Sequence, residues 1–467
     1  MKRVLVVGGG ISGLAAAHRL STLSAASRAP FEVVLAESSG RLGGKILGEK
    51  TAGGAVIEAG PDSFLAQKPQ AMDLIRELGL APRLIEAAES RVFVYVRGRL
   101  RPLPEGLFLM APRRLIPFLA SDFMTWRGKI RMALDLFHPR GTGEDQSMEA
   151  FAARHFGREA VETLVQPILA GIHGGEARAL GLKSTFPRFL DLERSHGSVI
   201  RGLRAPARNG GGRPAFMSLA GGLSELVDAL ASRLGPEKMR LNARILRISR
   251  AGGAWRADLE GGGAFEADGV LLAAPACAAA EMVSSSMPGL AESLRRIPFV
   301  STGTISLAYG PSAPRLPDGA GAVVAAGEVR TVSAMTFTSR KFPTRSPGGA
   351  ALLRCFFGGA GREALLDLDD GELVSRVRAD VERLLGIGRP PDAVRLHRWR
   401  KANPQYLVGH EDLLGRLQAL LEETPGLWLT GSSYRGVGIP DCVASGLESA
   451  EQAARFLSAP AGGAKFV

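Results

Sequence analysis

The first forty residues contain two short apolar runs separated by a helical pattern. Arg3–Val7 is apolar, residues 12–23 repeat apolar positions at helical spacing, and residues 31–36 form the second apolar run. Runs of this length predict strands, and their order predicts a β-α-β unit at the start of the chain. The predicted fold class is therefore α/β, and α+β over the whole chain.

Strand patterns return in the second half of the chain. A strand-turn-strand pattern covers residues 239–273 and ends in an apolar run at 270–274, and further strands are predicted at 302–309, 322–326, 350–357 and 427–430. Between about 90 and 210, short helical patterns interrupted by prolines replace the strands. This stretch is predicted to be a helical domain inserted into an α/β protein. Glycine-rich stretches at 209–214 and 459–464 predict a linker and a frayed terminus.

A length of 467 residues suggests two or three domains, and 45% hydrophobic residues exclude intrinsic disorder. The net charge of +12 is local, because residues 91–140 hold ten basic and three acidic residues and residues 183–213 hold seven and two. Such a patch suits an acidic ligand, nucleic acid or an anionic membrane, or is a solvated arginine-rich face. No apolar run reaches the eighteen residues of a membrane span.

The cysteines and histidines give no sign of a disulfide framework or a metal site. None of the three cysteines belongs to a CxxC pair, which fits a reducing cytoplasm. The seven histidines show neither HxxxH nor HExxH spacing. No metal is therefore expected.

A glycine motif follows the first predicted strand. Residues 8–13 read Gly-Gly-Gly-Ile-Ser-Gly and fit GxGxxG at a helix start. Gly8 permits a tight turn, Gly10 lets the backbone approach a pyrophosphate, and Gly13 allows close helix packing. Glu37 ends the second strand, where an acid binds a ribose hydroxyl and disfavours a 2′-phosphate. The sequence therefore predicts a dinucleotide site that does not favour NADP.

Two later segments extend this site. Arg41-Leu42-Gly43-Gly44-Lys45 would bring a cation and bare backbone to a second phosphate or to a flavin edge. Near the C-terminus, the strand at 427–430 leads through a glycine-rich turn, residues 431–438, into a helix. A turn of this kind presents N–H groups and a helix dipole to a partner that gains negative charge, as a flavin does on reduction.

The spacing Glu37-x3-Arg41-x-Gly43-Gly44 resembles that of the two-dinucleotide-binding-fold flavoproteins, the amine oxidase and phytoene desaturase superfamily. Together with the C-terminal turn, the segment Asn403-Pro404-Gln405-Tyr406-x2-Gly409-His410 makes nearly the whole chain similar to the oxygen-dependent porphyrinogen oxidase family. The resemblance implies FAD-dependent oxidation of protoporphyrinogen IX or coproporphyrinogen III by dioxygen, with hydrogen peroxide formation, late in haem biosynthesis. Six electrons separate porphyrinogen from porphyrin, so it implies three cycles of hydride transfer to the flavin.

The resemblance also implies a domain organisation. Residues 1–65, 214–275 and 411–467 would form a Rossmann-type FAD domain, residues 66–90 and 276–410 a mixed-sheet substrate domain, and residues 91–213 the helical insert. The FAD contacts it implies are Gly8, Gly9, Gly10, Ile11, Ser12, Gly13, Glu37, Ser38, Arg41, Gly43, Gly44, Lys45, Gly60, Pro61, Asp62, Ser63, Ile245, Trp399, Val437, Gly438 and Ile439. Of these, Ile245 would contribute only backbone, and both Ile245 and Trp399 also suit a hydrophobic core.

For the substrate, the resemblance implies Gly171, Val323 and Phe356 as pocket residues, although apolar side chains at the last two positions also suit a strand core. His173 stands where the family usually has an aromatic Tyr or Phe. The family's propionate-binding arginine falls on Val92, so the neighbouring Arg91, or another basic residue, is the candidate. No catalytic base is assigned, because the protein mainly orients the substrate and excludes water.

The first basic cluster lies beside an apolar stripe. Ser121 is predicted to cap a helix whose stripe is Phe123, Trp126, Ile130, Leu134 and Phe137, and whose basic neighbours are Arg127, Lys129 and Arg131. An apolar stripe with a basic flank suits an anionic leaflet, and the family's helical domain is linked to membranes. The alternative is that the stripe is only the core of the insert.

These features predict the partners: a porphyrinogen and dioxygen, with peripheral contact to an anionic membrane and no nucleic acid. The predicted location is the cytoplasm, or the inner face of the cell membrane. The oligomeric state is open, a homodimer included. The rival functions are a flavin amine oxidase, a carotenoid desaturase on the same scaffold, and a noncatalytic flavin-binding membrane protein.

Overall fold

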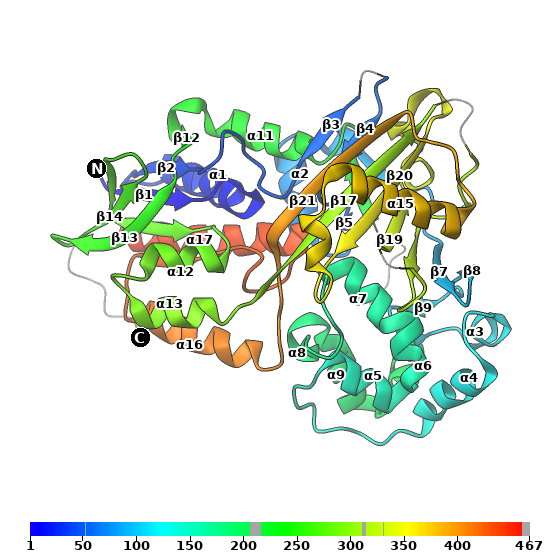
Figure 1. Cartoon of the computed structure of the whole chain (residues 1–467). Helices are drawn as coiled ribbons and strands as arrows, with labels where there is room; N and C mark the ends of the chain where they lie inside the picture. The colour runs from blue at the N-terminus through cyan, green and yellow to red at the C-terminus, as the bar shows by residue number, and fades with distance from the viewer. Residues whose placement is uncertain (52, 206–215, 311–313, 330, 460–467) are drawn as a thin grey trace.

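The computed structural model describes residues 1–51, 53–205, 216–310, 314–329 and 331–459. A parallel sheet with its helices lies at one end of the molecule, a large mixed sheet lies at the other, and a group of helices lies below the mixed sheet (Figure 1). The predicted linker at 209–214 and the chain from residue 460 onward are outside the described residues.

The first sheet has five parallel strands in the order β12-β2-β1-β16-β22. They come from distant parts of the chain: β1 (Arg3–Val7), β2 (Glu32–Ala36), β12 (Met239–Arg240), β16 (Gly269–Leu272) and β22 (Leu427–Leu429). Strands of a parallel sheet are covered on both faces, which is why they appear in the sequence as continuous apolar runs. The predicted β-α-β unit and the strands predicted near 270 and 427 are confirmed.

Helices cover both faces of this sheet. On one face, α1 (Ile11–Ala25) and α17 (Ile439–Ser458) share a core with α2 (Pro69–Glu77) and α11 (Ser224–Leu234). On the other, α12 (Ala276–Val283), α13 (Pro288–Arg295) and α16 (His410–Glu422) pack with the three-stranded sheet β13-β14-β15. Gly446 of α17 lies so close to α1 that a Cβ there would come within 2.4 Å of the Ser12 carbonyl oxygen. The first and last helices therefore meet backbone to backbone.

The mixed sheet has seven strands in the order β21-β17-β20-β19-β18-β7-β8. Strands β17 (Phe299–Tyr309), β18 (Gly321–Val324) and β20 (Ala351–Gly358) confirm the predictions near 302, 322 and 350. Strands β19 (Val332–Phe337) and β21 (Ala393–Pro404) were not predicted. Apolar residues of α15 (Asp370–Leu385) share a core with this sheet, while α7 (Gln166–His173) contacts β18 and β19.

The predicted start of the helical insert at residue 91 is wrong. Strands β7 (Val92–Val96) and β8 (Arg99–Pro102) pair with each other, and β7 adds to the mixed sheet beside β18. Side chains alternate along β7: Val94 and Val96 enter the core of the helical part, and Tyr95 enters the core of the mixed sheet. This strand therefore joins the two cores, and the helical part begins only after it.

The predicted helix cap at Ser121 is also wrong. Helix α4 (Trp126–Ala133) begins after Thr125, whose Oγ1 accepts a hydrogen bond from the Gly128 N–H at 3.1 Å. Ser121 instead ends α3 (Leu115–Ala120). The predicted stripe divides as a result: Phe123 is buried before the helix begins, whereas Trp126 is exposed.

The remaining short strands are β3 (Gly48–Lys50), β4 (Val56–Glu58), β5 (Phe64–Leu65), β6 (Leu84–Glu86), β9 (Leu107–Phe108), β10 (Ala111–Pro112), β11 (Phe216–Leu219), β13 (Ile245–Ala251), β14 (Ala254–Leu259) and β15 (Ala264–Ala267). The remaining helices are α5 (Met148–Phe156), α6 (Arg158–Ala160), α8 (Leu182–Thr185), α9 (Pro187–His196), α10 (Val199–Arg204) and α14 (Thr338–Lys341), and a π-helix at Val161–Val165 leads into α7. Among the described residues, no helix is both long and apolar enough to cross a bilayer.

Candidate functional site

One cavity of about 1660 Å³ runs between the parallel sheet and the mixed sheet. Its lining combines the glycine loop after β1, the segment after β4, the turn before α17, the end of α7 and the inner face of the mixed sheet. Ligand pockets for single small molecules usually measure about 300–1000 Å³, so this cavity has room for a large cofactor together with a substrate.

Most of the residues predicted to bind cofactor or substrate line this cavity. Of the predicted set, all but Gly9, Gly13 and Arg41 are part of its wall. The Gly9 N–H donates to the Glu37 carboxylate at 2.7 Å, and Gly13 packs against backbone. The Arg41 guanidinium donates to the carbonyl oxygens of Leu42, Gly44 and Ile46, so it braces its own loop.

The glycine loop has room for a ligand at one position only. A Cβ on Gly10 would meet no protein atom within 4 Å, and Gly10 faces the cavity. In contrast, a Cβ on Gly13 would lie 1.9 Å from the Gly8 carbonyl oxygen. Gly8 itself has φ +111°, which favours glycine. Gly8 and Gly13 are therefore required by the fold of the loop. Gly10 is the position that a pyrophosphate could approach.

Two helix N-termini reach the same cavity. Gly10 is the N-cap residue of α1 and Gly438 that of α17, and neither helix has a side chain that caps the free N–H groups of its first turn. Free N–H groups and the helix dipole favour an anionic group at such a position. Lys45 adds a positive charge nearby, with its amine 3.2 Å from Ser432 Oγ. Burial lowers the pKa of Lys45.

The segment after β4 is held by buried charges. Asp62 accepts from the Lys341 ammonium at 2.9 Å and pairs with the Arg354 guanidinium at 3.1 Å. Burial alone would raise the pKa of Asp62, but the two cations outweigh burial and hold it well below its usual range. Arg354 also donates to the carbonyl oxygens of Glu58 and Gly60, at 3.0 and 2.7 Å. Asp62 is therefore an anchor for the backbone that borders the cavity.

The cavity wall around the end of α7 is apolar. A Cβ added to Gly171 of α7 would come within 3.7 Å of Ala334 and 3.9 Å of Val323, so this helix lies close to the sheet. Phe356 lines the wall next to them. His173 is buried and packs edge-on against Phe186. Burial lowers the pKa of His173 to about 4, so the ring is neutral at pH 7.

Arg91 lies at the rim of the cavity and has no hydrogen-bond or ion-pair partner for its guanidinium among the described residues. Of the other lining cations, Lys68 pairs with Asp441, Arg244 with Glu260, and Lys341 and Arg354 with Asp62. Lys45, beside the turn before α17, also has no acidic partner among the described residues. Arg91 is thus the exposed lining cation that is available to an acidic ligand.

Trp399 and Ile245 both line the cavity and also make structural contacts within the protein. Trp399 donates from Nε1 to the Ala59 carbonyl oxygen at 3.0 Å. The Ile245 side chain is buried in the core behind the parallel sheet, as the sequence also allowed.

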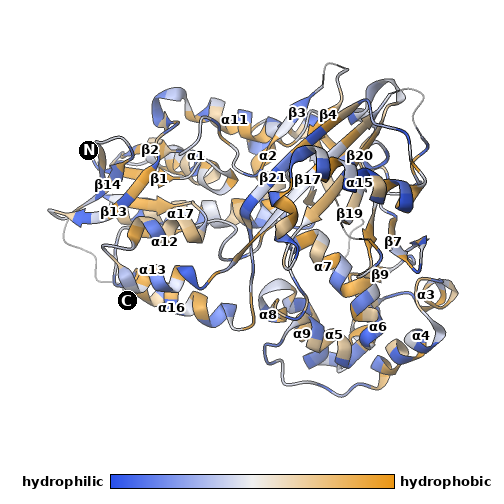
Figure 2. Cartoon of the chain, in the orientation of Figure 1, coloured by the Kyte–Doolittle hydropathy of each residue, from blue (hydrophilic) through white to orange (hydrophobic). Residues whose placement is uncertain are grey.

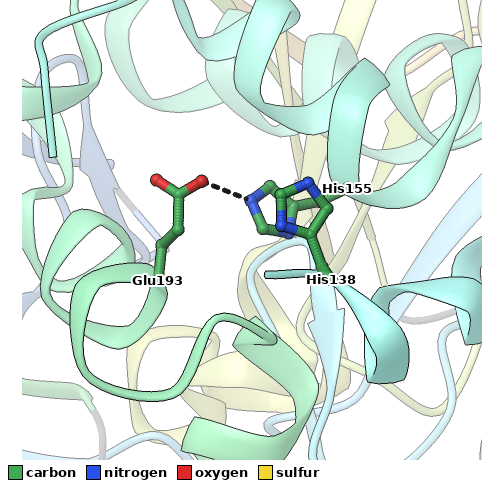
Figure 3. A group of neighbouring side chains, drawn as sticks. All are labelled: His138, His155 and Glu193. Carbon is green, nitrogen blue, oxygen red and sulfur yellow. Dashed lines mark hydrogen bonds and ion pairs between the residues drawn. The ribbon is translucent and has the colours of Figure 1, made fainter. Parts of the chain in front are cut away.

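The fold does bring together one group of metal-ligand types outside the cavity, His138, His155 and Glu193 (Figure 3). The Arg154 guanidinium lies 3.3 and 3.4 Å from the Nε2 atoms of His138 and His155, and it pairs with Glu193. His155 also bonds through Nδ1 to the buried Asp135. The Arg154 guanidinium already supplies positive charge among these three side chains, as a metal ion would. We therefore interpret the group as a set of polar contacts that joins helices of the insert.

Several lining residues were missed by the sequence analysis. Lys341 and Arg354 reach the cavity from the mixed sheet and its edge, nearly 300 residues after their partner Asp62. Lys68 lines the opening near α17 through its contact with Asp441. No local spacing connects these residues, so only the tertiary fold reveals them.

The fold and the cavity together are those of a flavoprotein, and the comparisons with known proteins agree. The family model described as flavin containing amine oxidoreductase matches residues 11–454. The chain belongs to this family of oxidoreductases, and its cofactor is a flavin.

Two relatives match nearly end to end. Coproporphyrinogen III oxidase of Bacillus subtilis is 34% identical over 98% of each chain. Protoporphyrinogen oxidase of Bos taurus is 31% identical over 96% of this chain and 98% of the relative. A crystal structure of a candidate protoporphyrinogen oxidase from Exiguobacterium covers 97% of this chain and 99% of its own, with a TM-score of 0.87 and 31% identity.

The glycine loop yields a paired prediction. Gly10→Ala adds a methyl group to open space in the cavity, so we expect the variant to fold with a free energy of unfolding within about 1 kcal/mol of the parent. We expect it to bind flavin at least about tenfold more weakly. Gly13→Ala forces a Cβ against a carbonyl oxygen and should cost about 3 kcal/mol or more. Chemical denaturation and flavin content after reconstitution measure both effects, and equal stability losses in the two variants would contradict this assignment.

Proposed function

We propose that this protein oxidises a porphyrinogen to the porphyrin with bound FAD, consumes dioxygen and forms hydrogen peroxide, as a late step of haem biosynthesis. The observation that carries the proposal is the single cavity in which a dinucleotide-type glycine loop faces an apolar wall large enough for a tetrapyrrole. The two relatives described above act on porphyrinogens according to their names and span the whole chain.

FAD would lie along the cavity side formed by the parallel sheet, whose strands come from the predicted ranges 1–65, 214–275 and 411–467. The predicted boundaries at 66–90 and 276 are too narrow, because α2, α12 and α13 pack on this sheet as well. The open backbone at Gly10 and the uncapped starts of α1 and α17 fit its diphosphate and the flavin edge that gains negative charge. Glu37 fits the ribose, and its oxygens also accept from the Gly9 and Ser39 N–H groups. When bound, FAD supplies the two-electron acceptor that dioxygen reoxidises.

The FAD is proposed to be held without a covalent bond. Cys442 lines the cavity at the start of α17, and its Sγ lies 4.0 Å from the Val437 carbonyl oxygen. Burial raises the pKa of this thiol, so it stays protonated and is a poor nucleophile.

On the substrate side, Gly171, Val323 and Phe356 would contact the tetrapyrrole face. This apolar wall would exclude water and orient the macrocycle, and the formation of an aromatic product drives the reaction. Arg91 would pair with a propionate, because its charge has no partner among the described residues. The protein needs no acid and base pair for this chemistry.

An amine oxidase fits the cavity less well. Such enzymes normally surround the amine with an aromatic cage. Here the aromatic side chains that line the cavity are Trp399 and phenylalanines such as Phe356, and none of the four tyrosines is among the described lining residues. Tyr434 in particular is buried in the core behind the parallel sheet.

The direct test is a steady-state comparison of coproporphyrinogen III, protoporphyrinogen IX and an amine such as putrescine. We expect both porphyrinogens to yield porphyrin and peroxide, coproporphyrinogen III with the higher kcat/KM, and the amine to yield no peroxide. In the same assay, Arg91→Ala should raise the KM of coproporphyrinogen III about tenfold, because a charge-assisted hydrogen bond contributes about 1.5–3 kcal/mol. Bound FAD should be unchanged.

Arg99→Ala is the matched control, since Arg99 is exposed on the adjacent strand and lies outside the cavity wall. Oxidation of the amine but not of the porphyrinogens would overturn the proposed function. A purified, FAD-loaded protein that oxidises nothing yet binds vesicles would favour the noncatalytic alternative.

We also propose that the outer corner of the helical part contacts an anionic membrane. Trp126, Ile130, Leu134 and Phe137 are 53–83% exposed, and Ile116 of the neighbouring α3 is 83% exposed. Figures 1 and 2 place α3 and α4 together at the edge of the molecule. The alternative reading of the stripe as the core of the insert does not account for this exposure, although Phe123 does belong to that core.

Only part of the predicted basic flank is available to a membrane. Arg127 is exposed, as are Arg113 and Arg114 before α3, of which Arg114 pairs with Glu105 at 3.0 Å. Lys129 is buried and donates to the Leu119 and Ser121 carbonyl oxygens, and Arg131 donates to three carbonyl oxygens around the end of α5. The last two residues therefore stabilise the insert and would not meet a leaflet.

Vesicle binding tests this surface. Replacing Trp126 and Phe137 by alanine removes two exposed side chains whose burial in a membrane would contribute about 1.5–3 kcal/mol each, so affinity for anionic vesicles should fall more than about tenfold. Added salt should weaken binding of the parent protein, and FAD content should stay constant. Leu241→Ala, at an exposed apolar position just after β12 and outside the cavity wall, is the control. Equal vesicle binding by parent and double variant would contradict the proposal.

A further inference from the structure

The segment Asn403–His410 lies between the two sides of the cavity. It leaves the mixed sheet at the end of β21 and enters α16 beside the parallel sheet, as the chain path in Figure 1 shows. Pro404 and Asn403 line the cavity, and the Asn403 amide donates to Thr302 Oγ1 at 2.9 Å. The segment therefore runs from one sheet to the other along the cavity wall.

One end of the segment holds the substrate side. The Gln405 amide nitrogen, which is buried, donates to the His173 carbonyl oxygen at 2.9 Å, at the last residue of α7. A Cβ on Gly175 would lie 2.1 Å from the Gln405 amide oxygen, so bare backbone is required there. The Gly181 N–H donates to the Tyr406 carbonyl oxygen at 2.8 Å. These contacts fix the end of the helix that carries Gly171.

The other end holds the turn before α17. The buried Tyr406 hydroxyl donates to the Ser432 carbonyl oxygen at 2.6 Å, and His410 Nε2 donates to the Tyr434 carbonyl oxygen at 2.9 Å. The Tyr406 and His410 rings stack at 4.4 Å between centroids. Ser432 in turn faces Lys45 across the cavity wall. Two side chains of one segment thus hold two carbonyl groups of the turn that borders the proposed flavin.

We propose that Asn403–His410 acts as a strut that sets the position of α7 relative to the turn 431–438, and that Gln405 and Tyr406 are positioning residues for electron transfer between substrate and flavin. Hydride transfer depends steeply on the separation of the reacting atoms, so a strut that joins the two walls directly limits variation in that separation. This inference rests on the proposed FAD site, but the contacts themselves do not depend on which substrate is oxidised.

The test uses Tyr406→Phe and Gln405→Leu in the full-length protein, with Tyr309→Phe as control. Tyr406→Phe keeps the stacked ring and removes only the hydroxyl. Tyr309 is another buried tyrosine, in β17, and does not line the cavity. Hydrogen-deuterium exchange is measured without porphyrinogen on peptides that cover 174–181 and 431–436. FAD release is followed by the fluorescence of freed FAD.

A strut predicts reciprocal effects. Each variant should increase exchange in both peptides, and each should speed FAD release about threefold to tenfold, the range set by the net contribution of one hydrogen bond. Gln405→Leu is decisive because Gln405 does not touch the turn 431–438. The control should change neither measurement. The inference would be overturned if hydrogen-deuterium exchange rose only in the peptide that contacts the replaced side chain, or if Gln405→Leu left the rate of FAD release unchanged.

The readouts also separate this inference from the proposed function. If the protein binds FAD but oxidises no porphyrinogen, the exchange and FAD-release results still decide whether the strut exists. If porphyrinogen oxidation is observed, Tyr406→Phe should lower the rate of flavin reduction while the KM of the porphyrinogen changes little, because the variant alters separation and not substrate contacts.

Discussion

A small group of buried charges holds the cavity together. Glu58 is the last residue of β4 and Asp62 follows it, while Arg354 reaches them from β20 and Lys341 and Arg345 from the connection between β19 and β20. A buried ion that loses its partner costs several kcal/mol, so these five groups must stay together in the folded protein. Because they belong to different parts of the chain, their pairing draws the dinucleotide part and the mixed sheet around one shared space.

The two walls of that space have different physical characters. The wall from the parallel sheet consists of glycines and uncapped helix starts, where bare N–H groups meet an anionic ligand. The wall from α7 and the mixed sheet is apolar around Gly171, Val323 and Phe356, and its cations Lys341 and Arg354 are paired with Asp62. An elongated, charged cofactor fits the first and a flat, largely apolar macrocycle fits the second. The strut, whose first residues Asn403 and Pro404 also line the cavity, is rich in buried polar side chains because it bonds to both walls.

The sequence was most informative where local pattern and chemistry coincide. The β-α-β unit, the glycine loop and the C-terminal turn each combine a strand signal, glycines and a helix start, and the structure has all three. It was least informative where function depends on pairs distant in the chain, such as Asp62 with Lys341. Local rules also misplaced the cap at Ser121, because Thr125 offers an equal hydroxyl one turn later. Strand β7 was assigned to the helical insert because its partner β18 lies more than 200 residues away.

The central claim is that a porphyrinogen delivers electrons directly to a flavin bound in this cavity. Anaerobic mixing of the FAD-loaded protein with coproporphyrinogen III measures that step alone. The account predicts rapid loss of the visible absorbance of oxidised flavin, its return when dioxygen is admitted, and peroxide formed with the porphyrin. A flavin that stays oxidised in the presence of either porphyrinogen would contradict the account.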